Sequence, residues 1–457
     1  MILFVENNTN FLVYAEIAKY ITEAHGLDCC ILTLSKKKTL YIKKLGIQSV
    51  FLGDIKAHEG ICFEKIIETI EDRNDSFTIA QYLNQDRHLK HYSYEKSHDL
   101  LKKYSELFYS FLLKENISLI VGELTWANEL LFMHISKSLF KITYVDLLNN
   151  YVFERPRLTF FDDKHTAKYL DLVADTVTIK TKFDLVSYRE NRKLLNMSTI
   201  FNSFSNYPLS KYIEKYKLLK DFGDSFDYKY DKKLKIFFNI NKKWNMFWNN
   251  LLGSYIFDEL DKNDCYYYYP LHIQPEATPD IVAPFYNNQL EIIEKISYSL
   301  PLGTFLYVKD HPDGLGYRGL KYYKKIKENK RVKLINYNIS SRHLIEKSLG
   351  VITIAGTAAI EARIMDKPVI LFSDIFFSTK VDHIYSIRDY NDIPVLLKRF
   401  KKDSLLFKSI NLERFLMYLN SASAEGYIYD PIIQPSVLDK SNIKNNGDFI
   451  VSFLGLQ

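Results

Sequence analysis

Short apolar runs alternate with longer segments of helical spacing along the first third of the chain. A short apolar run that stops at polar residues is typical of a buried strand, whereas apolar residues three and four positions apart indicate a helix. Regular alternation of the two predicts a parallel sheet covered by helices. We expect strands at Ile2–Val5, Cys29–Leu34, Ser49–Leu52, Ile117–Val121 and Thr143–Asp146, and helices at Phe11–Ala24, Lys37–Leu45, Glu129–Leu139 and through most of Phe63–Leu113.

The second half of the chain repeats this alternation more clearly. Each apolar run there is followed by a segment of helical spacing, which predicts a second doubly wound domain. The expected strands are Tyr266–Leu271, Phe305–Val308, Val332–Ile335, Val351–Ile354 and Val369–Phe372. The expected helices are Gln289–Ser299, Leu320–Glu328, Arg342–Lys347, Ala358–Met365, Ile393–Phe400 and Leu412–Asn420.

The middle of the chain separates these two regions. Residues 170–219 have helical spacing and are rich in lysine, so we expect them to extend the first domain, and the composition changes between Asp221 and Gly253. A chain of 457 residues also exceeds what one ordinary core accommodates. We predict an α/β protein with domains at 1–250 and 251–425 and a tail at 426–457 that crosses back to the first. Two Rossmann-like doubly wound domains facing across a cleft form the GT-B architecture, which does not by itself fix an activity.

Composition limits the class of protein. Apolar residues make up 47% and charged residues 25% of the chain, which is typical of a soluble globular protein. The net charge of +6 is mild, and no basic arm favours a nucleic-acid partner. The four cysteines have no Cys-x-x-Cys spacing, so free thiols in a reducing cytoplasm are expected. The first residues lack the basic start of a signal peptide, and no apolar run approaches the about 20 residues that span a bilayer. We therefore expect a cytoplasmic protein.

One segment leaves two interpretations open. Residues 232–248 combine lysines with Phe and Trp, which suits a peripheral contact with the inner face of the membrane. The same composition suits a buried strand between the domains.

Three loops in the second half carry candidate chemistry, each at the end of a predicted strand, where open α/β sheets bind ligands. Gly356 and Thr357 lie between a strand and a helix, where backbone N–H groups attract phosphate, and Glu361 follows one turn later as an acceptor for ribose hydroxyls. The alternative is an ordinary helix cap made by Thr357 and Glu361. The loops predict a site for an anionic, hydroxyl-rich ligand such as a nucleotide-activated sugar.

The other two loops supply charged and amide side chains. Strand alternation places Lys309 and His311 on one side, as a phosphate cation and as a hydrogen-bonding or proton-donating group. The alternative is a solvated strand end. His272, Gln274 and Glu276 alternate in the same way and suit sugar or base groups, although Gln274 and Glu276 could instead bond loop backbone.

The first half offers carboxylates that could act as a general base for an acceptor hydroxyl. Glu123 follows Gly122, which permits close approach of a ligand, and Asp146 ends a predicted strand, where it could instead cap a helix. Arg155 and Arg157 could bind an anionic acceptor, although solvated arginines are the default. No two aspartates are separated by a single residue, so we expect no metal and no other cofactor, with Lys, His and a helix end neutralising the leaving phosphate.

With these residues in place, the second half resembles the bacterial capsule polysaccharide biosynthesis family, which includes β-Kdo transferases. The matching segments are Tyr269-Pro-Leu-His-Ile-Gln-Pro-Glu-Ala-Thr278, Val308-Lys-Asp-His-Pro312, Gly356-Thr-Ala-Ala-Ile-Glu-Ala362 and Lys367-Pro-Val-Ile370. A thinner similarity covers Gly122-Glu123 and Arg155-Pro-Arg157 before Phe160-Phe161. His311 matches the His-Pro histidine that serves the CMP phosphate in bacterial CMP-sialic acid transferases of similar fold. Glu361 matches the acidic residue that would hold the ribose.

The resemblance implies a glycosyltransferase that builds capsule or lipopolysaccharide, with the acceptor on the N-terminal domain and a nucleotide sugar on the C-terminal one. The expected reaction is metal-independent transfer of a sugar, preferably an ulosonic acid such as Kdo from its CMP derivative, to a glycan or lipid-linked glycan. The alternatives are a UDP-sugar-dependent transferase, a sugar-nucleotide epimerase, and a non-catalytic GT-B scaffold in an envelope assembly complex.

Overall fold

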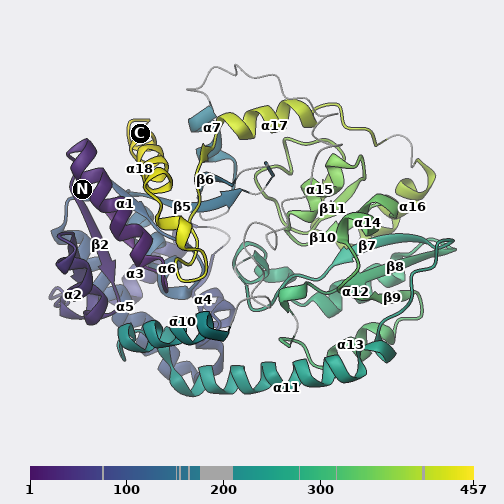
Figure 1. The fold of residues 1–457 in the computed structure, drawn as a ribbon, viewed down its shortest axis with the longest axis horizontal. Helices are drawn as coiled ribbons and strands as arrows, with labels where there is room; N and C mark the ends of the chain where they lie inside the picture. Colours follow the sequence, from purple (N-terminus) through teal and green to yellow (C-terminus); the bar gives the residue numbers. More distant parts are fainter. Residues whose placement is uncertain are drawn as a thin grey trace. The chain divides into compact units, whose positions relative to one another are not determined.

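The computed structural model describes residues 1–74, 77–150, 152–153, 156–162, 165–174, 209–276, 278–314, 316–403 and 407–456. These form two compact units. The first contains the described residues of Met1–Lys180 and Arg192–Lys232 together with Tyr418–Gln457, and Lys233–Met417 belongs to the second. Figure 1 shows the elements of both units in chain colours.

The first unit is built on a seven-stranded sheet in the order β13-β6-β5-β4-β1-β2-β3. Its five parallel strands are β1 (Ile2–Val5), β2 (Cys29–Thr33), β3 (Gln48–Phe51), β4 (Leu119–Val121) and β5 (Thr143–Asn150). Two antiparallel strands, β6 (Arg157–Phe161) and β13 (Ala424–Glu425), extend the sheet beyond β5. Because the strand order reverses between β1 and β4, the carboxyl ends of these two strands form the switch point where open α/β sheets bind ligands.

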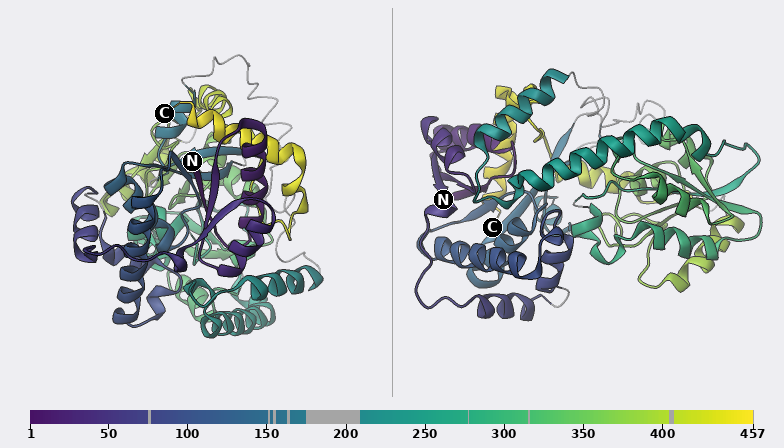
Figure 2. Two further views of the ribbon diagram at one scale, coloured as in Figure 1. Left: turned by 90° about the vertical axis from the view of Figure 1, so that its left-hand side faces the viewer. Right: turned by 90° about the horizontal axis from the view of Figure 1, so that it is seen from below.

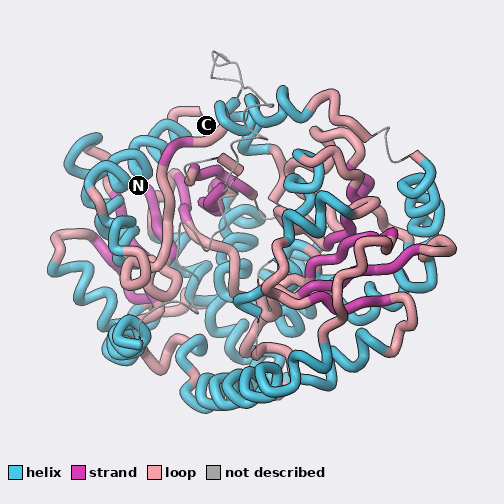
Figure 3. Tube along the Cα trace, turned by 45° about the vertical axis from the view of Figure 1, so that its right-hand side comes forward, coloured by secondary structure: helices cyan, strands magenta, loops and turns pink. Residues whose placement is uncertain are grey.

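Helices surround this sheet, as Figure 3 shows. They are α1 (Phe11–His25), α2 (Lys36–Lys44), α3 (Phe63–Asp72), α4 (Ile79–Gln85), α5 (Tyr94–Lys114), α6 (Ala127–Phe140), α7 (Lys168–Ala174), α10 (Leu209–Phe222) and α18 (Lys440–Leu454). Helix α18 lies beside α1 in the views of Figures 1 and 2.

Local sequence explains where several of these helices begin and end. Helix α1 ends at Gly26, whose φ of 66° is left-handed and whose N–H donates to the Thr22 carbonyl. The side chains of Ser35 and Ser93 accept the N–H groups of Lys38 and Lys96 and thereby cap the starts of α2 and α5.

The second unit has a six-stranded, fully parallel sheet in the order β12-β11-β10-β7-β8-β9. Its strands are β7 (Cys265–Pro270), β8 (Thr304–Lys309), β9 (Val332–Ile335), β10 (Val351–Thr353), β11 (Val369–Leu371) and β12 (Ile384–Ser386). Its helices are α11 (Lys232–Ile256), α12 (Gln289–Ser299), α13 (Leu320–Lys327), α14 (Ser341–Lys347), α15 (Ala358–Ile364) and α16 (Ile393–Lys402). The chain returns to the first unit within α17 (Leu412–Ser421). The switch point of this sheet lies between β7 and β10.

Strand β7 is buried on both faces, which explains its four consecutive tyrosines. Tyr267 and Tyr269 point into the apolar core, and the Tyr267 hydroxyl donates to the Leu397 carbonyl. On the other face Tyr266 stacks on Tyr307 with ring centroids 3.9 Å apart. The tyrosines therefore fill the volume of core residues while most of their hydroxyls stay hydrogen-bonded.

The predicted fold class, α/β with two Rossmann-like doubly wound domains, is confirmed by these two sheets. The division falls after Lys232, whereas we expected it near residue 250, because α11 is one continuous helix that packs on the second unit. The alternative of a buried strand at 232–248 is wrong for the same reason. The return to the first unit begins at Tyr418, ahead of the expected tail at 426. Of the expected helical stretch 170–219, residues 175–208 lie outside the described residues.

Among the described residues, no helix combines the length and the apolar character that crossing a bilayer requires.

Candidate functional site

Three neighbouring strands of the second unit bring the predicted C-terminal residues to one edge of the sheet. Strands β10, β7 and β8 are adjacent and parallel, so their carboxyl ends meet. His272 follows β7, Lys309 ends β8, and Gly356 follows β10. The site therefore lies at the switch point of this sheet.

His272 is the centre of the edge. Its Nε2 accepts the backbone N–H of Ile354 at 3.3 Å and lies 2.9 Å from the Thr353 hydroxyl. Burial, with the nearby charges of Arg318 and His311, lowers the pKa of His272 to about 4, so the ring is neutral at physiological pH. With Nε2 accepting an N–H, the ring proton resides on Nδ1. His272 thus acts first as a structural link between the ends of β7 and β10.

Gly356 is required where it stands because a side chain there would meet this imidazole. A Cβ at Gly356 would lie 2.8 Å from Cε1 of His272. Thr357 begins α15 without a side-chain cap bond, and its side chain is exposed. The Thr357 hydroxyl therefore does not cap its own helix, so that alternative interpretation is wrong for Thr357.

Lys309 is a buried cation at the end of β8. Its ammonium donates to the Ile339 carbonyl at 2.9 Å. Burial lowers the pKa of Lys309 to about 8, although the nearby carboxylates of Glu361 and Asp310 oppose this shift. His311, two residues later, is exposed.

Two residues that the sequence reasoning missed hold this loop in place. Asp310 is fully buried and accepts from Arg318 at 2.7 Å, from the Tyr323 hydroxyl at 2.7 Å and from the His311 N–H at 2.7 Å. Arg318 also donates to the His272 carbonyl. The pair therefore ties the β8 and β7 ends together. No local sequence pattern predicts this Asp310–Arg318 pair, because the groups that it joins lie on separate segments.

Gln274 and Glu276 belong to a loop whose contacts are largely internal. The Gln274 amide donates to the Asn287 carbonyl at 2.7 Å and accepts from Gln289 at 2.7 Å. Buried Gln289 also accepts the His272 N–H at 2.8 Å and donates to its carbonyl at 3.0 Å. The N–H of Glu276 donates to Asp280 at 3.0 Å. For Gln274 these contacts match the alternative interpretation, in which its amide holds the loop.

The edge as a whole can bind an anion. It presents the buried ammonium of Lys309 and the exposed imidazole of His311 at the end of β8, and the exposed side chain of Thr357 after β10. The carboxyl groups of Glu276 and Glu361 are suited to hydroxyls. The roles predicted for the individual side chains stay predictions.

In the first unit Glu123 lies at the equivalent switch point, after β4. Its two carboxylate oxygens accept from the side-chain amides of Asn10 and Asn7, the latter at 2.8 Å. Burial, followed by the nearby charges of Glu129 and Asp146, raises the pKa of Glu123 to about 8. A carboxyl group with such a pKa can exchange a proton near neutral pH. The space beside Gly122 is taken by the Tyr144 hydroxyl and Val5, so the close approach expected there is made by the protein itself.

The other acceptor-side candidates differ in their surroundings. Asp146 is buried within β5, and its carboxylate lies 3.4 Å from His165. Burial raises the pKa of Asp146 although His165 opposes the shift. Arg157 donates to the Ser423 hydroxyl at 2.7 Å and to the Asn420 carbonyl at 3.0 Å, which anchors the returning chain to β6. Arg155 lies outside the described residues.

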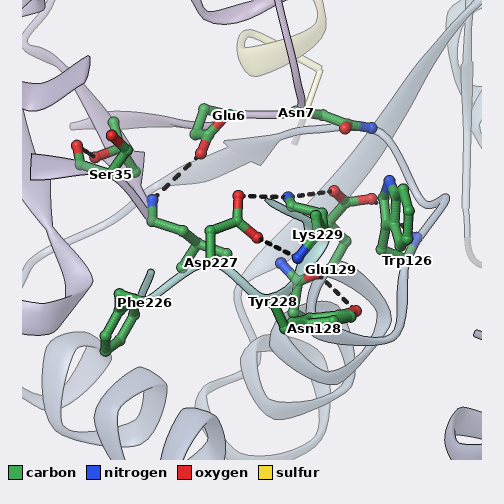
Figure 4. Close-up of polar contacts among 12 residues, drawn as sticks. Glu6, Asn7, Ser35, Trp126, Asn128, Glu129, Phe226, Asp227, Tyr228 and Lys229 are labelled. Carbon is green, nitrogen blue, oxygen red and sulfur yellow. Dashed lines mark hydrogen bonds and ion pairs between the residues drawn. The ribbon is translucent and has the colours of Figure 1, made fainter. Parts of the chain in front are cut away.

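A buried ionic network lies beside Glu123. Figure 4 shows Lys229 between Glu129 and Asp227, with N–O distances of 3.5 and 3.9 Å. Glu129 also accepts the N–H groups of Thr125 at 2.9 Å and of Trp126 at 3.1 Å, at the start of α6.

A second ion pair completes the network. Lys38 donates to Glu6 at 2.6 Å, with both side chains buried. Burial raises the pKa of Glu6, but the charges of Lys38 and Lys229 outweigh this and leave it lowered. The switch point of the first unit is thus lined by two carboxyl groups whose pKa values are shifted in opposite directions, lowered for Glu6 and raised for Glu123.

Comparison with known proteins finds one matching family, over part of the chain. Residues 209–380 match the model of a family described as capsule polysaccharide biosynthesis protein. This segment is less than half of the chain and contains all the matching C-terminal motifs, so the predicted resemblance is confirmed there. No curated protein matches the chain.

Solved structures that match the chain share little sequence with it. A Rickettsia africae glycosyltransferase is 11% identical with a TM-score of 0.31, covering 99% of this chain and 98% of its own. The UDP-GlcNAc 2-epimerase of Methanocaldococcus jannaschii is 12% identical with a TM-score of 0.32, covering 92% and 99%. The β-Kdo 2,7 transferase KpsC of Thermosulfurimonas dismutans is 12% identical with a TM-score of 0.33, covering 81% and 98%. Values this low carry no argument about activity.

Proposed function

We propose that the chain is a glycosyltransferase of surface polysaccharide synthesis. It transfers a sugar, preferably an ulosonic acid such as Kdo from its CMP derivative, to a glycan or lipid-linked glycan without a metal ion. The observation that supports this most is the meeting of His272, Lys309 and Gly356 at one switch point. The family match over residues 209–380 covers the same site.

In this proposal the second unit binds the donor. The Lys309 ammonium pairs with the donor phosphate, and His311 and Thr357 donate hydrogen bonds to its oxygens. Glu361 accepts from the ribose hydroxyls, and Glu276 is the further candidate for sugar or base contacts. His272 and Gln274 hold the loops that carry these groups.

The first unit binds the acceptor. The acceptor oxygen attacks the anomeric carbon, the bond from that carbon to the phosphate oxygen breaks, and CMP leaves with the bonding electron pair. The acceptor proton passes to the Glu123 carboxylate, which Asn7 and Asn10 hold in position. Asp146 is the alternative base. A lipid-linked acceptor would place the enzyme at the inner face of the cytoplasmic membrane.

Release of CMP from CMP-Kdo in the presence of a capsule or lipopolysaccharide acceptor tests the reaction. We expect turnover that persists in EDTA and is abolished in His311→Ala with circular dichroism unchanged. His58→Ala, which removes an exposed histidine of the first unit, is the matched control and should keep full activity. Unchanged polymer synthesis in His311→Ala would instead identify a non-catalytic scaffold.

Two further measurements separate the enzyme classes. Thermal shifts with CMP, UDP, GDP and ADP rank the nucleotides, and a strong preference for UDP would overturn the assignment of a CMP donor. Incubation of the donor without acceptor should leave the sugar unchanged, whereas an epimerase would convert it.

A further inference from the structure

Helix α11 combines lysines with several large aromatic side chains. Its 25 residues, KKLKIFFNINKKWNMFWNNLLGSYI, include five lysines and no aspartate or glutamate. They also include two tryptophans, three phenylalanines and a tyrosine. Figures 1 and 2 show it as one uninterrupted helix.

One side of α11 leaves an apolar row exposed. The row follows intervals of four or three residues, so its members lie on one side of the helix. Each of them is more than half exposed. They are Ile236, Ile240, Trp244, Phe247, Leu251 and Tyr255.

The opposite side of α11 is fixed to the second unit. Asn245 donates to the Gly316 carbonyl at 3.0 Å, and buried Asn249 donates to the Arg318 carbonyl at 2.9 Å. The Lys242 ammonium lies 4.2 Å from the centre of the Tyr317 ring. The apolar row therefore faces outward because the other side of the helix is held by specific contacts.

Charge decides which partner this side fits. Exposed apolar rows this long on a folded domain mark interaction surfaces. An α11 from a second copy is a poor partner, because two helices with lysines and no acidic residue repel each other. An anionic bilayer satisfies both features, since aromatic and aliphatic side chains enter the headgroup boundary while lysines such as Lys243 pair with lipid phosphates.

We propose that the exposed side of α11 docks the protein on the surface of an anionic lipid bilayer, with the helix lying in the plane of the headgroups. This docking does not depend on the proposed transfer reaction. Of the two interpretations left open by the sequence, the proposal adopts the membrane contact and assigns it to a defined surface, the row from Ile236 to Tyr255.

Vesicle flotation of the full chain tests the docking. The protein should float with vesicles of equal parts phosphatidylcholine and phosphatidylglycerol and remain below with phosphatidylcholine alone. The double variant Trp244→Ala, Phe247→Ala should bind the anionic vesicles at least about tenfold more weakly, because it removes two aromatic groups from the inserted side. Lys243→Glu should weaken binding several-fold.

The matched control is Leu302→Ser, which removes a side chain of the same unit that is 90% exposed but lies outside α11. It should float like the unchanged protein. Circular dichroism and thermal unfolding establish that each variant is folded. The emission of Trp244 and Trp248 should shift to the blue on anionic vesicles, since Trp126 is already buried.

Flotation of the double variant equal to that of the unchanged protein would overturn the proposal. Failure of the unchanged protein to bind anionic vesicles would also overturn the proposal. Concentration-dependent sedimentation that the double variant abolishes, with no vesicle binding, would assign the surface to a second copy.

Discussion

Replacing Lys229 by methionine tests whether the buried network of the first unit stabilises it. Lys229 is 2% exposed, with Glu129 at 3.5 Å and Asp227 at 3.9 Å. At an effective dielectric constant of about 20, each pair at such a distance attracts by roughly 4 kcal/mol. Methionine keeps most of the volume but leaves two buried carboxylates without their cation. Methionine avoids the cost of burying a charged ammonium, which offsets part of the lost attraction. We therefore expect a net loss of about 3–5 kcal/mol in the free energy of unfolding at pH 8.

The loss should depend on pH. Burial raises the pKa of Glu129 to about 7 and that of Asp227 to about 6, although Lys229 opposes both shifts. A carboxyl group whose folded pKa is raised favours the folded state at low pH, and this contribution fades as the pH rises through the folded pKa. Without Lys229 both pKa values rise further, so protonation relieves the variant. The destabilisation at pH 5 should therefore be smaller than at pH 8 by at least about 1 kcal/mol.

Urea titration followed by circular dichroism at both pH values measures these losses. Adding Glu129→Gln to the variant should recover about 1–3 kcal/mol, because one of the two unpaired charges is removed. Lys444→Met is the control. Its ion pair with Asp448 is shorter, at 2.7 Å, but exposed, so the urea midpoint should not move.

A Lys229→Met variant within about 1 kcal/mol of the unchanged protein at pH 8, or a loss that is equal at both pH values, would refute the reasoning.

Three further predictions concern catalysis. In the unchanged protein the donor KM should rise above about pH 8, because the phosphate-binding ammonium of Lys309 loses its proton as the pH passes its pKa of about 8. Lys309→Met should raise the donor KM at least about tenfold and abolish this dependence on pH. Initial rates measured against pH test both effects. Asn7→Leu should move the acid limb of the kcat profile upward by about one pH unit, because it removes a hydrogen bond that stabilises the Glu123 carboxylate; an unmoved limb would separate Glu123 from the reaction. Gly356→Ala should weaken CMP binding at least several-fold in calorimetry, since the new Cβ would press on His272.

The fold was predictable because burial imposes a simple pattern on a doubly wound sheet. Strands such as β7 and β8 are covered on both faces, so they appear in the sequence as continuous apolar runs. The strands that escaped prediction are short edge strands, β12 and β13, and β6, which pairs antiparallel. Their pairing depends on distant segments that periodicity does not reveal.

The candidate site was predictable to the extent that it follows strand ends. Parallel strands deliver their carboxyl ends to one edge, which is why His272, Lys309 and Gly356 could be grouped from the sequence. The residues that hold this edge could not be found. Arg318 and Gln289 gain their roles from buried partners on other segments.

Glu129 shows the same limit in the first unit. The sequence predicts only that Glu129 begins a helix, yet its side chain is fully buried against Lys229, one hundred positions later. Its burial depends on the folded position of that lysine, which periodicity does not reveal. The Thr125 and Trp126 N–H groups that donate to Glu129 lie within four residues of it, whereas the cation comes from a distant segment.

The return of the chain to its starting unit has a consequence for synthesis on the ribosome. Strand β13 pairs with β6, and Phe449 of α18 stacks on Phe160 with centroids 4.2 Å apart. The nascent chain therefore cannot complete the first unit until β13 and α18 have left the exit tunnel. The Lys233–Met417 segment is continuous and can fold first. This reverses the usual order, in which the N-terminal domain folds first during synthesis.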